Sequence, residues 1–211
     1  MNADMKFWDK IAPKYAKSAI SDEESYRYAL GRTRSYLKPN DRVLELGCGT
    51  ASTAIELAKG VDSFVATDIS EGMLKVGRQR AEEAGAANLT LLHRPAEDLA
   101  EGAFDAVLAH NLLHLLPNLE EVLAKVAAKL PTGGLFISKT PCLGEQAGTW
   151  KYYMYKVAIP LMKLVGKAPS FVDFTRVRDL EAMVQAAGFE IIETGNYPPT
   201  TPSRYLVARK R

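Results

Sequence analysis

Short apolar runs alternate with amphipathic segments through most of the chain. The runs are short enough to be strands, and they lie at residues 42–46, 64–67, 89–92, 104–109 and 135–138. The segments at 51–59, 70–84 and 119–130 follow them, and the last of these places apolar residues at three- and four-residue spacing, which predicts a helix. Strands that alternate with helices of this length predict βαβ units, and therefore a parallel sheet covered by helices on both faces.

The last part of the chain departs from this alternation. Residues 176–187 are expected to form a helix that stops at Gly188, and residues 189–193 form the next strand. Residues 196–202 contain three prolines and predict a turn-rich connection to a final strand at 204–208. Two strands without a helix between them are most simply antiparallel neighbours. The sequence therefore predicts a three-layer α/β sandwich with a mainly parallel seven-stranded sheet and an antiparallel last strand.

Two helical additions flank this sheet within one predicted domain, 1–211. Residues 1–38 form an N-terminal cap, in which one helix face carries Phe7, Trp8, Ile11 and Tyr15. A second helix begins near Asp22, which is a plausible N-cap, and ends before Pro39 because the residue before a proline disfavours helix. Residues 141–175 are a helical insertion after the fifth strand, on the expected substrate side.

Composition narrows the class of protein. The 211 residues are 47% hydrophobic and 25% charged, with a net charge of +2, which fits one globular core and gives no indication of a nucleic-acid partner. The start of the chain lacks the apolar stretch of a signal peptide, and no window reaches the roughly 18 apolar residues that span a bilayer. We therefore expect a cytoplasmic protein. Cys48 and Cys142 show no metal-ligand spacing.

The strongest candidate site follows the first strand. Gly47 and Gly49 permit a tight turn and close backbone approach at the position where sheets of this kind bind ligands. Asp68 ends the second strand, 21 residues after Gly47, and its carboxylate can accept two hydrogen bonds from ribose hydroxyls. Ser52 stands where a dinucleotide fingerprint has its third glycine, and the chain lacks the Gly-Lys-Ser/Thr of a P-loop.

These motifs resemble those of the class I S-adenosylmethionine-dependent methyltransferases, in the family's order over about residues 41 to 140. The matching segments are 43–50 (VLELGCGT), 66–74, 94–99, 104–107 with 113–116, and 130–134. Residues 7–15 also resemble the opening of small-molecule members, including the quinone-ring C-methyltransferases. The resemblance implies S-adenosylmethionine as cofactor, S-adenosylhomocysteine as product, and direct in-line transfer of the methyl group.

The resemblance also implies the residues that bind the cofactor. They are Tyr15, Glu45, Gly47, Cys48, Gly49, Asp68, Ile69, Met73, Ala96, Glu97 and His110. Two positions depart from the family pattern: Ala51 replaces a third glycine, and Pro95 stands where an aspartate often reads the adenine amine. Glu97 or Asp98 can replace that aspartate, with the Ala96 N–H reading the ring. We prefer Glu97, and the alternative is that both are solvated loop acids.

Several roles stay open at this point. Tyr15 is either a lid over the methionine end of the cofactor or a packed aromatic side chain, and Cys48 is expected to be a small filler facing the sheet. His110, near the end of the fourth strand, is a candidate catalytic base or a pocket-lining residue, as is its neighbour Asn111. His114 is expected to be a packing residue.

The insertion is expected to choose the acceptor. Residues 150–165 are rich in Tyr, Met and aliphatic side chains, with lysines at 151, 156, 163 and 167. The segment fits a lid over a lipophilic acceptor, a peripheral membrane contact through residues 150–167, or a dimer contact or ordinary packed helix. We predict methylation of a small lipophilic or aromatic molecule. The alternatives are a membrane-associated phospholipid N-methyltransferase and a non-catalytic S-adenosylmethionine-binding protein. RNA and protein acceptors are disfavoured because no Asn-Pro-Pro-Tyr or Asp-Pro-Pro-Tyr motif occurs.

Overall fold

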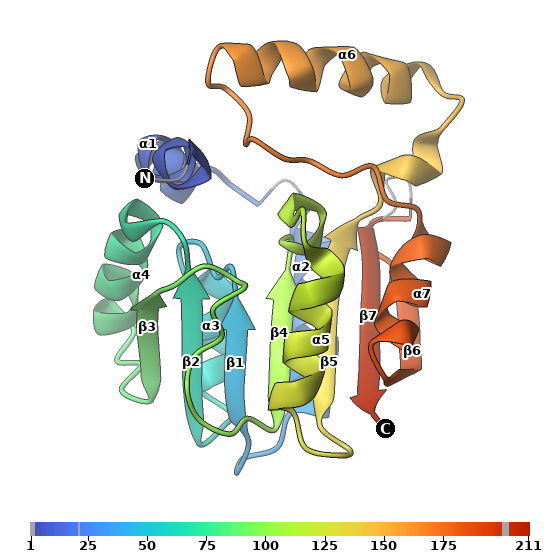
Figure 1. The fold of residues 1–211 in the computed structure, drawn as a ribbon. Coiled ribbons are helices and arrows are strands. Elements are labelled where there is room, and N and C mark those ends of the chain that lie inside the picture. The colour runs from blue at the N-terminus through green and yellow to red at the C-terminus, as the bar shows by residue number, and fades with distance from the viewer. Residues whose placement is uncertain (1–2, 21, 200–202) are drawn as a thin grey trace.

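The computed structural model describes residues 3–20, 22–199 and 203–211, and its centre is one seven-stranded sheet. The strands lie side by side in the order β3-β2-β1-β4-β5-β7-β6 (Figure 1). Their bounds are β1 Arg42–Leu46, β2 Ser63–Asp68, β3 Leu89–His93, β4 Ala106–His110, β5 Leu135–Pro141, β6 Phe189–Asn196 and β7 Ser203–Lys210. The first five strands pair in parallel, and β7 is antiparallel to both β5 and β6. The predicted mainly parallel sheet with an antiparallel last strand is confirmed.

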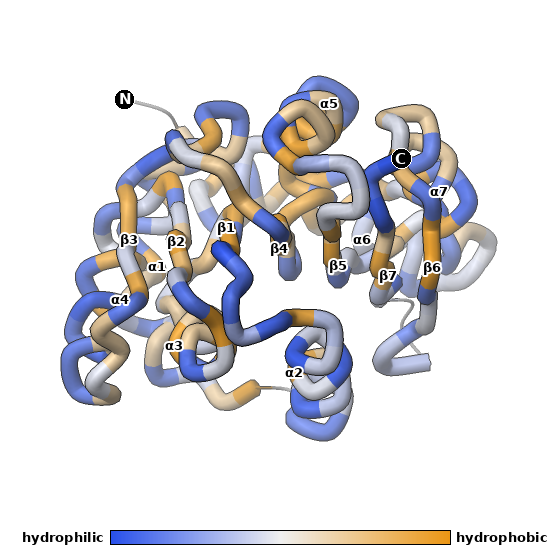
Figure 2. Tube along the Cα trace, turned by 90° about the horizontal axis from the view of Figure 1, so that it is seen from below, coloured by the Kyte–Doolittle hydropathy of each residue, from blue (hydrophilic) through white to orange (hydrophobic). Residues whose placement is uncertain are grey.

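Seven α-helices surround the described sheet. They are α1 Ala3–Lys17, α2 Glu23–Tyr36, α3 Ser52–Ala58, α4 Glu71–Glu83, α5 Leu119–Lys129, α6 Trp150–Leu164 and α7 Val177–Ala186. Single 3₁₀ turns follow β4 (η1, Leu113–Leu115) and β5 (η2, Leu143–Gln146). Seen along the strands, α5 and α7 cover one face of the sheet, and α2 and α3 cover the other (Figure 2).

Each face has its own apolar core. The core under α5 and α7 includes Leu44, Val107 and Phe136, and that under α2 and α3 includes Val43, Phe64 and Leu108. Alternate residues of one strand therefore enter opposite cores, as the two-residue period of a strand requires. This double burial explains why the central strands read as continuous apolar runs rather than as alternating ones.

The helix caps follow the sequence closely. The side chain of Asp22 accepts a hydrogen bond from the Ser25 N–H at 2.9 Å, as its expected N-cap role requires. Ser70 caps α4 in the same way, accepting from the Met73 N–H at 3.1 Å. The last two strands are longer than predicted, because the antiparallel pairing of β6 with β7 continues through Gly195 and Asn196. Residues 200–202 of the predicted connection lie outside the described residues.

Two helices, α1 and α6, stand at the end of the sheet where the parallel strands finish (Figure 1). Helix α1 is also joined to the segment that follows α6, because the Asp4 carboxylate accepts hydrogen bonds from the Ser170 N–H at 2.6 Å and the Ser170 hydroxyl at 2.5 Å. The N-terminal cap and the insertion thus meet over one edge of the sheet. Within the described ranges, none of the helices is long and apolar enough to cross a bilayer.

Candidate functional site

The loop after β1 makes its turn with left-handed backbone. Gly47 and Gly49 have φ angles of 66° and 55°, a region that costs glycine little. A Cβ on Gly47 would lie 2.7 Å from Leu112 Cδ1, so the turn also requires a residue without a side chain at this position. Ala51, which replaces the third glycine of the resembling family, is left-handed as well, with φ 59°. That conformation costs an alanine about 1 kcal/mol.

The Asp68 carboxylate lies directly beneath this loop. One of its oxygens accepts the Gly49 N–H and the other accepts the Ser70 N–H, each at 2.8 Å. Burial raises the pKa of Asp68, and the two backbone hydrogen bonds oppose that rise. Because an ionised carboxylate offers about four lone-pair sites, each oxygen keeps a free acceptor position. Asp68 therefore positions the loop and can still accept from two neighbouring hydroxyls.

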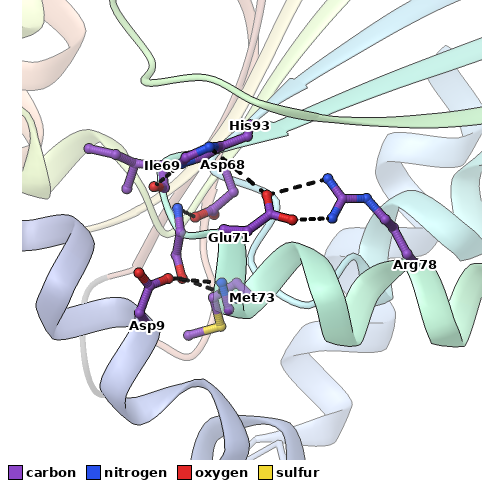
Figure 3. Close-up of polar contacts among 9 residues, drawn as sticks. Asp9, Asp68, Ile69, Glu71, Met73, Arg78 and His93 are labelled. Atoms are coloured by element: carbon purple, nitrogen blue, oxygen red, sulfur yellow. Dashed lines mark hydrogen bonds and ion pairs between the residues drawn. The ribbon is translucent and has the colours of Figure 1, made fainter.

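Helix α1 is fastened to the start of α4 beside this carboxylate (Figure 3). One oxygen of Asp9 accepts the Ser70 hydroxyl at 2.6 Å and the Gly72 N–H at 2.8 Å. Arg80 of α4 reaches back, donating to the Ala16 carbonyl at 2.6 Å and to the Thr50 hydroxyl at 2.9 Å. These contacts connect the N-terminal cap both to the loop after β1 and to the start of α4. The amphipathic pattern of α1 predicted a packed helix, but nothing in it singled out Asp9.

Replacing Asp9 with alanine is expected to lower the free energy of unfolding by about 1–2 kcal/mol, since two net hydrogen bonds are lost. Asp9→Asn is the matched control, because its amide oxygen can still accept both hydrogen bonds. Urea unfolding measures the difference between the two variants. Equal unfolding free energies for Asp9→Ala and the wild type would show that the contact does not hold α1.

Glu45 and His110 form a pair at the ends of β1 and β4. Glu45 is 2% exposed, and its Oε1 lies 3.2 Å from His110 Nδ1. Since a carboxylate only accepts, the Nδ1 carries the proton and Nε2 is left to a ligand. The other carboxylate oxygen, Oε2, is buried without a hydrogen-bond partner among the described residues. A buried unpaired carboxylate oxygen is costly, and a donor group on a bound molecule would satisfy it.

Tyr15 and Cys48 occupy the two sides of the loop. Tyr15 remains half exposed, and a Cβ on Gly49 would lie 4.0 Å from its ring. Partial burial and the nearby Asp68 carboxylate raise the pKa of Tyr15. Cys48 packs against the core under α2 and α3, and both cysteines of the chain are free. Burial raises the pKa of the Cys48 thiol well above its usual range, so it is neutral and suited to filling space.

The remaining predicted residues flank this centre. Met73 is buried at the start of α4, and the Ile69 carbonyl lies 2.8 Å from the His93 ring. Ala96 is buried, whereas Glu97 is exposed. Asp98 is also exposed and lies 3.1 Å from Arg94. Asp98 is engaged in this ion pair. Glu97 is therefore the carboxylate of this segment whose side chain has no hydrogen bond or ion pair among the described residues.

His114 lies apart from this arrangement, on η1. Burial lowers the pKa of His114 to about 4, and its Nδ1 has no hydrogen-bond partner in the described part of the chain. The ring is therefore neutral near pH 7 and packs under the segment after α6, where the Asp173 N–H donates to the His114 carbonyl at 2.7 Å.

Comparison with known proteins gives one family and several relatives. The family model described as "Methyltransferase domain" matches residues 37–185. A demethylmenaquinone methyltransferase of Clavibacter sepedonicus is 28% identical over 209 residues, covering 90% of this chain and 83% of that protein. Its counterpart in Bacillus cereus is 29% identical over 210 residues, covering 88% and 86%. A highly reducing polyketide synthase of Purpureocillium lilacinum is 30% identical over 137 residues, which is 59% of this chain and 5% of the synthase.

Solved structures share the fold at lower identity. The magnesium protoporphyrin IX methyltransferase of Synechocystis PCC 6803, solved with bound S-adenosylhomocysteine, has a TM-score of 0.69 at 19% identity, over 98% of this chain and 93% of that one. The [4+2]-cyclase SpnF has a TM-score of 0.74 at 15% identity, over 100% of this chain and 97% of that one. At these identities the likeness concerns the fold alone.

Proposed function

This chain belongs to the methyltransferase domain family, and from that membership we propose that it methylates a small lipophilic or aromatic acceptor. It is a class I S-adenosylmethionine-dependent methyltransferase, and S-adenosylmethionine is its cofactor. The observation that carries the proposal is the Asp68 carboxylate, buried under a left-handed glycine loop with an acceptor position left on each oxygen.

The residues present fit this cofactor at both ends. The free positions of Asp68 suit the two ribose hydroxyls, and the unpartnered Glu45 Oε2 suits the methionine ammonium group. Gly47, Cys48 and Gly49 would place backbone along the methionine part. Residues on the adenine side would be Ile69, Met73, Ala96 and Glu97, and Tyr15 would close over the site from α1.

Bound S-adenosylmethionine supplies a methyl group that its sulfonium already activates. The chain has to orient the acceptor in line with it, which is the main contribution that positioning makes to a transfer of this kind. His110 is the proposed proton acceptor. Glu45 holds the Nδ1 proton, so Nε2 faces the acceptor as the basic nitrogen.

The acceptor side is proposed to be the insertion, residues 141–175, and the N-terminal cap, residues 1–38, would close the same end of the sheet within a single domain, 1–211. The Asp4–Ser170 contact supports this arrangement because it joins the two additions. Closure of this kind excludes water from the transfer. The relatives named demethylmenaquinone methyltransferase support a quinone-like aromatic acceptor.

The test is methyl transfer from labelled S-adenosylmethionine to a panel of demethylated quinols, simple phenols and lipid amines. Labelled product from a quinol or phenol, lost in Asp68→Ala, supports the proposal. Product from the lipid amines alone would favour the phospholipid N-methyltransferase alternative. Cofactor binding without any labelled product would favour a non-catalytic binding protein, and the fold likeness to a cyclase shows that this architecture is not confined to methyl transfer.

A peripheral contact with an anionic membrane is proposed for α6. Every side chain of this helix is at least partly exposed, including Trp150 at 70% and Leu164 at 83%. Residues 150–167 contain four lysines and no acidic residue. Apolar side chains beside uncompensated positive charge fit the interface of a bilayer that contains anionic lipid.

Reversing two exposed charges, in Lys151→Glu/Lys167→Glu, is expected to weaken binding to phosphatidylglycerol vesicles about tenfold or more, since each lysine near the surface contributes about 1 kcal/mol. Vesicle co-sedimentation measures the change. The control is Lys38→Glu/Lys75→Glu, which alters net charge equally at exposed positions away from α6. If both double variants sediment alike, α6 is not the membrane contact.

A further inference from the structure

A row of ionisable side chains crosses the ends of β1, β4 and β5. Lys139 of β5 lies in register with His110 of β4, and residues in register on neighbouring strands point to the same face of a sheet. His110 in turn contacts Glu45 of β1 at 3.2 Å. The row therefore places Lys139 on the side of His110 that is away from the loop after β1. This is the end of the sheet over which α6 and its connections lie (Figure 1).

The Lys139 ammonium group has no hydrogen bond or ion pair among the described residues, although the side chain is partly buried. Burial lowers the pKa of Lys139, and the Asp22 carboxylate opposes this from the start of α2. Asp22 Oδ1 accepts the Ser25 N–H, and no ion pair joins Asp22 to Lys139 in the described part of the chain. A partly buried cation that lacks a direct partner is costly, and an anionic group on a ligand would offset that cost.

The other groups facing Lys139 are not such partners. Tyr205 of β7 is its register neighbour on the second side, and it is fully buried with its hydroxyl 3.3 Å from that of Thr33 on α2. Burial raises the pKa of Tyr205 far above neutrality, so the phenol stays uncharged. Glu45 is two strands away from Lys139 and its contact is with His110. Of the negative groups in this set, neither Asp22 nor Glu45 makes an ion pair with Lys139.

We propose that Lys139, beside His110, binds a hydroxyl oxygen of the acceptor as an oxyanion, so that the acceptor is a phenol or a hydroxyquinone rather than a neutral lipid or an amine. This inference rests on the proposed function, because it places the acceptor at the end of β4. It adds the oxygen that the site recognises and the residue that recognises it.

The proposed step keeps its charges in balance. The acceptor O–H bond breaks, its proton passes to His110 Nε2, and the electron pair stays on the oxygen beside Lys139. The acceptor then uses this electron density to form a bond from oxygen, or from the conjugated ring carbon, to the methyl carbon. When the ring carbon is methylated, its own proton then leaves and the oxygen regains one, which restores the aromatic ring. The carbon–sulfur bond breaks as the new bond forms, and sulfur keeps its electron pair. Lys139 stabilises the negative charge on the oxygen, and Glu45 stabilises the positive charge that appears on His110.

The test uses 4-nitrophenol, whose phenolate form has its own absorbance, with the full chain saturated in S-adenosylhomocysteine. Wild type is expected to lower the apparent pKa of the bound phenol by about one unit or more, as a neighbouring cation does. Lys139→Met keeps the length of the side chain without its charge. It is expected to abolish the shift and to weaken phenolate binding about tenfold, the equivalent of one pKa unit. Lys75→Met, an exposed lysine on α4, is the matched control and should behave as wild type.

A second comparison needs no variant. Wild type should bind 4-nitrophenolate at least about tenfold more tightly than the neutral 4-nitroanisole, which has no ionisable hydroxyl. Equal affinities, or an unchanged phenol pKa shift in folded Lys139→Met, would overturn the role of Lys139. Calorimetry with S-adenosylhomocysteine separates the two claims. If the wild type does not bind S-adenosylhomocysteine, the proposed function itself is refuted. If it binds S-adenosylhomocysteine but does not ionise the phenol, only this inference is refuted.

Discussion

Replacing Asp68 with alanine is expected to weaken the binding of S-adenosylhomocysteine about a hundredfold or more, the effect of losing two hydrogen bonds. The variant loses the acceptor for two ribose hydroxyls, and a hydrogen bond to a charged group contributes about 1.5–3 kcal/mol. It also frees the Gly49 and Ser70 N–H groups, which the carboxylate now holds at 2.8 Å. The loop that should meet the methionine part is therefore loosened at the same time. Calorimetric titration measures the dissociation constant.

Two variants separate these effects. Asp68→Asn keeps one oxygen and can hold part of the loop, so we expect an affinity between those of the wild type and Asp68→Ala. Asp62→Ala removes an exposed acid from the turn just before β2 and should bind as wild type does. An Asp68→Ala protein that is folded by circular dichroism and binds the ligand with unchanged affinity would refute the assignment of this site.

Gly144→Ala is expected to lower the free energy of unfolding by about 1–3 kcal/mol, the usual cost of overpacking, and to raise the KM for the acceptor. A Cβ at this position would overlap the Phe174 backbone oxygen and lie 2.9 Å from that of Thr175. Backbone cannot rotate away as a side chain can, so the segment after α6 has to move. The Gly144 N–H now donates to the Thr175 carbonyl at 3.0 Å, and that bond would be strained as well.

The matched control is Gly31→Ala on α2, where no described atom beyond its chain neighbours and its own helix backbone lies within 4 Å of the added carbon. A glycine inside a helix is less favourable than alanine by about 1 kcal/mol, so this variant should be slightly more stable than wild type. Urea unfolding and acceptor saturation curves measure both proteins. If Gly144→Ala raises the acceptor KM and leaves cofactor affinity unchanged, the insertion serves the acceptor. An unchanged KM would mean that this segment does not reach it.

The sequence predicted the sheet better than the site. Strand positions followed from apolar runs, and the cap at Asp22 followed from side-chain chemistry, because both signals are local. The fourth strand begins at Ala106 rather than at Phe104. Phe104 is nevertheless buried, so its apolar side chain indicated burial and not a position in the strand.

Contacts between distant segments were beyond the reach of local patterns. Glu45 and His110 were each singled out, but their pairing depends on β1 and β4 being neighbours in the sheet. Asp9 and Lys139 were not singled out, since an isolated charged residue near a helix or strand end is ordinary. Their roles appear only when α1 packs against the start of α4, which brings Asp9 to Ser70, and when the sheet order places Lys139 beside His110. The alanine at position 51 does not itself indicate a left-handed backbone, and the family glycine that it replaces was the available signal.

The place of β7 in the sheet has a consequence for how the protein is made. β6 touches the rest of the sheet through β7, which is later in the chain and lies between β5 and β6. During synthesis, β5 and β6 are both finished while the strand that joins them is still inside the ribosome. The nascent domain therefore waits with an open edge on β5, the kind of edge that recruits stray strands. The edge of β5 is closed only once residues 203–210 emerge and pair with it.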